Sequence, residues 1–196
     1  MKRKNALLLA IVAALVCALG ICGLSACSGN GGSGGKSDDQ IIEEQLAEYM
    51  DRNLSKDFFA EKTRADTDLA ALEEHGFDID KYAENYSKLF SYKITEVQVD
   101  GDKAIAKIEM TVPVFGEEFQ ALLTERTATL GLENIPDQQQ ALATFWNAYA
   151  DLMADPSMPK ATDTVEIAFV KTSGNWNFED EQQFADDMQA LMTAAQ

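Results

Sequence analysis

YKITEVQVDGDKAIAKIEMTVPV, residues 92–114, contains two runs in which apolar and polar side chains alternate. Such alternation predicts β-strands, because successive side chains of a strand point to opposite faces of a sheet. Asp100 and Gly101 separate the runs, and this pair predicts a tight hairpin because both residues tolerate positive φ. One face of the second run carries only apolar side chains, whereas the other is polar except for Ile105. We therefore predict an antiparallel hairpin with one buried face.

A second hairpin is predicted near the C-terminus. Residues 162–172, TDTVEIAFVKT, and residues 175–178, NWNF, flank the turn-forming pair Ser173-Gly174. Acidic residues 179–181 then precede an amphipathic segment, an arrangement typical of a helix N-terminus. The prediction is four antiparallel strands in two hairpins, followed by a C-terminal helix.

Helical periodicity occupies two other parts of the sequence. Apolar residues recur every three or four positions from about residue 40 to 60, which predicts one helix. Asp66 and Asp78 are expected to cap two further helices, the first of them closed by a glycine. Residues 117–155 contain two more amphipathic segments, a helical insertion between the hairpins. This order of elements predicts a single α+β domain over residues 40–196, with helices packed on the sheet.

The first 26 residues differ in composition from the rest of the chain. Residues 2–4 are basic, residues 6–19 are apolar, and small residues continue to Ala26, with no acidic side chain. This is the layout of a secretory signal peptide. The alternative is an uncleaved transmembrane anchor, because the uncharged stretch of 22 residues from Ala6 to Cys27 is just long enough to span a bilayer.

Leu24-Ser25-Ala26-Cys27 resembles the lipobox of bacterial lipoproteins. The resemblance implies that residues 1–26 are a lipoprotein signal peptide, cut between Ala26 and Cys27. It also implies that the Cys27 thiol carries a diacylglyceryl group, with acyl chains such as palmitate, as a thioether. Two acyl chains anchor a protein stably, whereas one anchors only marginally. We therefore expect a lipid-anchored protein on the extracytoplasmic face of the cell membrane, within the cell envelope.

Residues 28–39, SGNGGSGGKSDD, are rich in glycine and serine and lack any side chain that suits a core. Together with Cys27 they are expected to form a flexible tether over residues 27–39. Twelve such residues have an r.m.s. span of roughly 20 Å and a taut reach of about 40 Å. The tether is long enough to hold the domain clear of the lipid head groups.

Charge and cysteine content limit the kinds of partner that the domain can have. The chain of 196 residues has 33 acidic and 16 basic residues, and without the three basic residues of the signal the formal charge is −20. A domain of this charge repels phosphates, so no nucleic-acid partner is expected. Cys17, Cys22 and Cys27 are the only cysteines. The domain therefore has to fold without disulfides, and about 150 residues suffice for this.

The hairpin over residues 92–110 and the ending VEIAFVKTSGNWNF, residues 165–178, are similar to extracytoplasmic lipoprotein domains of the nuclear transport factor two-like (cystatin-like) superfamily. That resemblance implies a sheet curled around helices into a cone with a pocket. The superfamily includes enzymes, such as ketosteroid isomerases, and plain binding modules. The chain departs from it in the helical insertion of residues 117–155, and no catalytic residue can be carried over.

Candidate chemical residues are few, and none forms a recognisable catalytic or metal-binding motif. His75 is the only histidine, and its position at a predicted helix end fits a favourable interaction with the helix dipole. Zinc sites need clustered histidine or cysteine ligands, and calcium loops need a defined run of oxygen ligands, so no metal or other cofactor is expected. Glu109, Arg126, Trp146 and Tyr149 are the residues that could line a pocket, although the helical spacing of the two aromatics favours core positions.

Three classes of function remain compatible with the sequence. The first is a non-catalytic binding or accessory module on a lipid anchor, whose partner is an envelope protein, a peptide or a small molecule. The second is a cone-fold enzyme that uses a buried carboxylate such as Glu109 as acid or base. The third is a structural protein of the envelope. The lipid anchor and the lack of a catalytic motif favour the first class.

Overall fold

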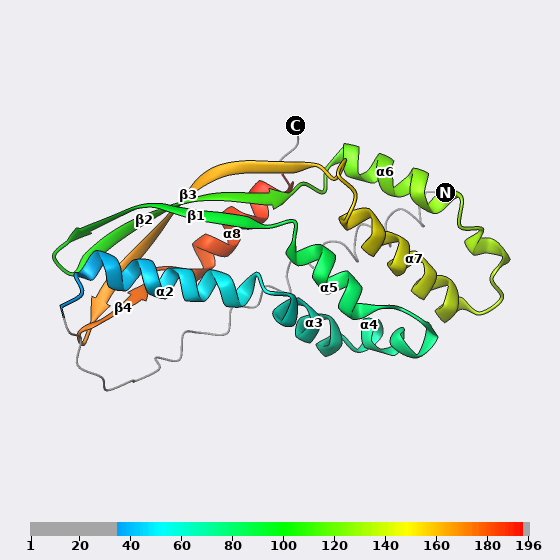
Figure 1. Cartoon of the computed structure of the whole chain (residues 1–196), viewed down its shortest axis with the longest axis horizontal. Helices are drawn as coiled ribbons and strands as arrows, with labels where there is room; N and C mark the ends of the chain where they lie inside the picture. Colours follow the sequence, from blue (N-terminus) through cyan, green and yellow to red (C-terminus); the bar gives the residue numbers. More distant parts are fainter. Residues whose placement is uncertain (1–34, 194–196) are drawn as a thin grey trace.

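The computed structural model describes residues 35–193, and it contains one four-stranded antiparallel sheet in the order β1-β2-β3-β4 (Figure 1). The strands are β1 (Ser91–Asp100), β2 (Lys103–Pro113), β3 (Lys160–Thr172) and β4 (Asn175–Phe178). Neighbours in the sheet are also neighbours in the sequence, so the sheet is two hairpins with a helical insertion between them. The predicted α+β class and strand order are confirmed.

The first hairpin differs from the prediction only in the position of its turn. Asp100 pairs with Lys103, so Gly101 and Asp102 form the turn instead of Asp100 and Gly101. Gly101 has φ 62, a conformation that costs glycine little because it lacks a Cβ atom. All the predicted inward residues of β2 are buried, and Ile105, the apolar exception on the other face, is 44% exposed.

The second hairpin also forms as predicted. Ser173 and Gly174 both have positive φ, at 53° and 84°, as a two-residue turn between twisted strands favours. Strand β3 begins at Lys160, two residues earlier than expected. Strand β4 pairs with only four residues of β3, Phe169 to Thr172. Strand β2, in contrast, pairs with β3 along the whole of β2.

The long helix expected over residues 40–60 is two helices, α2 (Asp38–Asn53) and α3 (Lys56–Ala65). The break follows from Ser55, whose backbone is extended and whose hydroxyl accepts a hydrogen bond from Phe58 N–H at 3.1 Å. A serine that caps a helix in this way satisfies a backbone donor that would otherwise lack a partner. Apolar periodicity continues across the break, and this is why the pattern alone predicts one helix.

The remaining helices follow the predicted caps closely. Asp66 caps α4 (Thr67–Ala71), which continues as the 3₁₀ turn η1 (Glu73–His75), and Gly76 closes this segment with φ 95. The carboxylate of Asp78 accepts a hydrogen bond from Lys81 N–H at 2.9 Å and begins α5 (Ile79–Ser87). The insertion between the hairpins consists of α6 (Glu117–Ala128), η2 (Leu132–Asn134) and α7 (Gln138–Met153), and the chain's last described helix is α8 (Glu181–Thr193).

Two apolar clusters form the core of the described residues. In one, α2 and α8 pack on the inner face of the sheet, around Ile108, Met110 and Phe169. In the other, helices α3 to α7 pack on one another beyond the ends of the strands (Figure 1). Leu54 and Phe90 are among the partly buried residues that contact both clusters. The two halves therefore share one continuous interior.

Between residues 35 and 193, no helix is both long enough and apolar enough to cross a bilayer. The apolar stretch of the predicted signal lies outside the described residues, as does Cys27.

Candidate functional site

An apolar pocket lies where α2 ends, α3 begins and α8 passes beside them. Its volume is about 50 Å³. Aliphatic and aromatic side chains make most of its walls. The lining residues are Tyr49, Met50, Asn53, Leu54, Phe58, Phe184, Ala185 and Met188.

One wall of the pocket is formed at the break between α2 and α3. Leu54 lies between the two helices, and the Ser55 cap starts α3 so that Phe58 reaches the same opening. On the opposite wall, Phe184 and Met188 are one helical turn apart on α8 and are buried. Ala185, which is half-buried, leaves the space that a larger side chain would fill.

Tyr49 forms an aromatic part of the pocket wall. Its ring lies 4.9 Å from the ring of Phe178 and 6.4 Å from that of Phe184, measured between centroids. Burial, with a smaller contribution from the charge of Glu181, raises the pKa of Tyr49 to about 12. Tyr49 is therefore neutral at physiological pH.

The one amide in the lining is already engaged. Asn53 Nδ2 donates a hydrogen bond to the backbone oxygen of Tyr49 at 2.7 Å. The pocket thus offers apolar contact and dispersion rather than charge or strong hydrogen bonding.

The size of the pocket restricts what can occupy it. An engineered apolar cavity of about 150 Å³ holds one benzene molecule, whereas this pocket has a volume of about 50 Å³. The space inside it suits one small aliphatic side chain and does not enclose a ring.

Trp146 and Tyr149, two of the predicted pocket residues, belong to the core formed by helices α3 to α7, which we call the helical half. Their ring centroids are 5.2 Å apart, and both side chains are 3% exposed. Phe77 packs against Trp146, and Phe119 packs edge-on against Tyr149. Burial raises the pKa of Tyr149 well above its usual value. The core interpretation of this aromatic spacing is confirmed.

Arg126, the third predicted residue, lies at the surface on α6. Its Nη2 atom is 3.0 Å from Oδ2 of Asp155. The pKa of Asp155 is lowered mainly by hydrogen bonds from the backbone N–H and hydroxyl of Ser157, and Arg126 contributes further. Among residues 35–193 no hydrogen bond or ion pair joins Arg126 to Trp146 or Tyr149, and its ion pair is with the loop after α7.

Glu109, the fourth predicted residue, points away from the core. It lies on the outward face of β2, opposite Lys93 and Thr164, and its side chain is exposed. None of the aspartates and glutamates between residues 35 and 193 is buried. In that part of the chain the structure does not supply the buried carboxylate that the enzyme hypothesis requires.

His75 is the last residue of η1, at a helix end as expected. Its Nδ1 atom lies 4.0 Å from Oδ1 of Asp137, the residue that caps α7. No group of three or more potential metal ligands occurs within the described residues.

A polar cluster that the sequence did not predict fastens the start of the domain. The carboxylate of Asp38 accepts hydrogen bonds from Lys171 Nζ, at 2.9 Å to each oxygen, and from Trp176 Nε1 at 3.2 Å. Lys171 Nζ also lies 5.3 Å from the centroid of the Trp176 ring, within cation–π range. We call these three residues the Asp38 clamp. The two hydrogen-bond donors, Lys171 first, lower the pKa of Asp38.

The predicted end of the tether at Asp39 is wrong, because helix α2 already begins at Asp38. Ser37 precedes the first residue of α2, and its backbone N–H donates to Oε1 of Gln40 at 3.2 Å. Asp38 and Asp39 therefore belong to the domain. A serine followed three residues later by glutamine is a capping-box pattern, which could have indicated this boundary from the sequence.

Comparisons with known proteins give one structural likeness. No protein-family model matches the chain, and no curated protein sequence does. A solved structure of ycdA from Bacillus subtilis, proposed to be a lipoprotein, aligns at 15% sequence identity with a TM-score of 0.44. The alignment covers 78% of this chain and 47% of ycdA, so this chain spans about half the length of that protein.

Proposed function

We propose that the protein is a lipid-anchored lipoprotein of the cell envelope whose folded domain is a non-catalytic binding module. The observation that carries the anchor is the sequence Leu24-Ser25-Ala26-Cys27 between an apolar signal and a glycine-rich tether. Diacylation of Cys27 would hold the chain stably at the extracytoplasmic face of the membrane. The domain is then free to act on partners in the same envelope.

The apolar pocket between α2, α3 and α8 is the proposed binding site. Its volume and lining favour a single aliphatic side chain as occupant. Such a side chain would belong to a protein or peptide, because a small metabolite would need more room and more polar contacts. Interfaces commonly gain most of their affinity from one anchor residue in a desolvated pocket.

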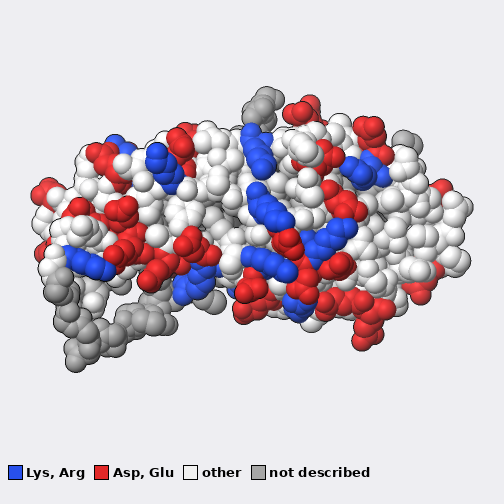
Figure 2. Space-filling view, viewed as in Figure 1, with Lys and Arg blue, Asp and Glu red and all other residues white. Residues whose placement is uncertain are grey.

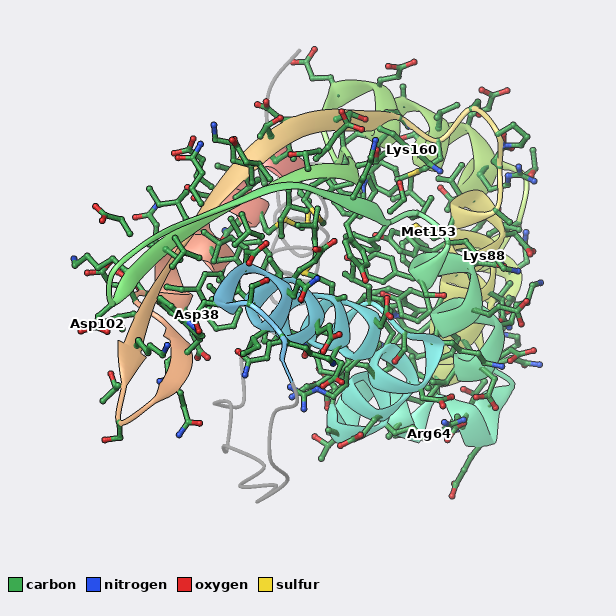
Figure 3. All side chains as sticks on the ribbon, turned by 60° about the vertical axis from the view of Figure 1, so that its left-hand side comes forward. Asp38, Arg64, Lys88, Asp102, Met153 and Lys160 are labelled. Atoms are coloured by element: carbon green, nitrogen blue, oxygen red, sulfur yellow. The ribbon has the colours of Figure 1, made fainter. Side chains whose placement is uncertain are left out.

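We also propose a relation to the nuclear transport factor two-like superfamily, and the shape of the sheet supports it. The sheet is a curved meander with α2 and α8 on its inner face (Figure 3). The insertion of α6 and α7 between β2 and β3 is the main departure from that pattern.

Site-specific photocrosslinking in the native host tests the binding site. A benzophenone side chain would be placed at Asp57, an exposed residue next to the pocket residue Phe58. We expect a crosslinked partner that is lost in Ala185→Trp, which fills the pocket, and kept in Ala190→Trp, at an exposed position on the same helix. Equal crosslinking in the two tryptophan variants, with both folded by circular dichroism, would contradict the proposed site.

A further inference from the structure

The chain enters the domain at the end of the molecule where both hairpins turn. The Asp38 clamp joins the first turn of α2 to Lys171 and Trp176, close to the turn between β3 and β4. Lys171 N–H donates to the backbone oxygen of Asp102, in the other hairpin turn, at 2.8 Å. Asp38 and Asp102 accordingly lie at the same end of the molecule (Figure 3). We call this the hairpin-tip end.

The helical half lies at the opposite end. Strand β1 begins there, β2 ends there and β3 begins there, so all three long strands connect to helices α5 to α7 at that end (Figure 1). Arg64 and Met153 are found on that side (Figure 3). The 13 residues of β3 alone extend about 43 Å at about 3.3 Å per residue.

The covalent chain limits how far the hairpin-tip end can be from Cys27. Eleven Cα-to-Cα steps separate Cys27 from Asp38, and at about 3.6 Å each they reach at most about 40 Å in any conformation. That reach is shorter than β3 alone, and the helical half lies beyond the end of that strand. The clamp holds Asp38 at the hairpin turns, so the end of the tether is at the hairpin-tip end.

Charge works against a domain that lies with its α2 and α8 face on the membrane. Helix α2 carries six acidic residues and one basic residue, and α8 carries three acidic residues and no basic one. Acidic side chains gather over α2 on the face shown in Figure 2. An anionic lipid surface repels such a face over a Debye length of about 8 to 10 Å.

We propose that the domain stands on the membrane with its hairpin-tip end toward the lipid and its helical half outermost. This orientation rests on the proposed lipid anchor at Cys27. Along α2, whose 16 residues rise about 1.5 Å each, the pocket at the far end of the helix lies about 24 Å from the clamp. An envelope partner therefore reaches the pocket and the outer surface of α6 and α7 without approaching the lipid head groups.

Fluorescence energy transfer from one dye on the protein to labelled lipids tests the orientation. The lipidated protein, purified from its native host, would be reconstituted in vesicles of phosphatidylcholine and phosphatidylglycerol that contain a rhodamine lipid as acceptor. With Cys27 alkylated, a cysteine introduced by Asp102→Cys or by Gln139→Cys is the one reactive thiol of each mature variant. Both positions are exposed, the first at the hairpin-tip end and the second at the start of α7 in the helical half.

We expect a larger loss of donor emission from the dye at position 102 than from the dye at position 139. Insertion of a second copy of residues 28–34 should then reduce the loss at position 102. Equal or reversed losses in protein that floats with the vesicles would overturn the orientation. Protein that fails to float with the vesicles would instead contradict the anchor, so the two failures are distinguishable.

Discussion

Asp38, at the start of the folded domain, makes side-chain contacts with residues near the other end of the sequence. It accepts hydrogen bonds from Lys171 and Trp176, which are 133 and 138 positions further along the sequence. Hydrogen bonds to a charged group are stronger than those between neutral groups. Asp38 therefore ties the entry point of the chain to the second hairpin.

Replacement of Asp38 by asparagine should lower the melting temperature near neutral pH, and the effect should depend on pH. Lys171 and Trp176 lower the pKa of Asp38 in the folded chain, whereas the unfolded chain keeps a value of about 3.9. The stabilisation by the clamp is therefore complete above about pH 4 and disappears as the pH falls through the lowered pKa. Thermal melts of wild type and Asp38→Asn should converge in that acidic range.

The matched control for the clamp is Asp39→Asn. Asp39 is exposed on the same turn of α2, and no ion pair or hydrogen bond of its side chain occurs within the described residues. It should leave the melting temperature nearly unchanged. A difference between wild type and Asp38→Asn that is independent of pH, or that Asp39→Asn reproduces, would show that the clamp does not act through the charge of Asp38.

Among the elements, the two hairpins were predictable because their signals are local. Alternation sets the faces of β2, and the pairs around Gly101 and Gly174 set the turns. The break between α2 and α3 was not predicted, because the apolar stripe continues through Leu54 and the capping role of Ser55 depends on its extended backbone. Periodicity reports which face is buried but not where a helix stops.

The Ser55 cap has a measurable contribution to the start of α3. Ser55→Ala should reduce the free energy of unfolding by about 1 kcal/mol, because Phe58 N–H loses its acceptor. Ser55→Asp should retain most of the stability, since aspartate also caps helices. Denaturant titrations measure both effects. A loss in Ser55→Asp as large as that in Ser55→Ala would show that the hydroxyl does not act as a cap.

For the whole molecule, the sequence predicted the class of fold better than it predicted the site. The meander sheet, the helical insertion and the core positions of Trp146 and Tyr149 follow from patterns within single segments. The pocket and the clamp do not, because each brings together residues from both ends of the domain. Met50 and Met188 line one opening although 138 positions separate them. Only tertiary packing reveals such a site.

Intact-mass measurement of the mature protein from its native host tests the central proposal most directly. The lipid anchor predicts a chain that begins at Cys27, carries a diacylglyceryl thioether and fractionates with membranes. Cys27→Ser should abolish the modification and the membrane association, while Cys22→Ser, within the predicted signal, should leave both intact. A mature chain that retains Met1, or one that begins with an unmodified Cys27, would contradict the anchor.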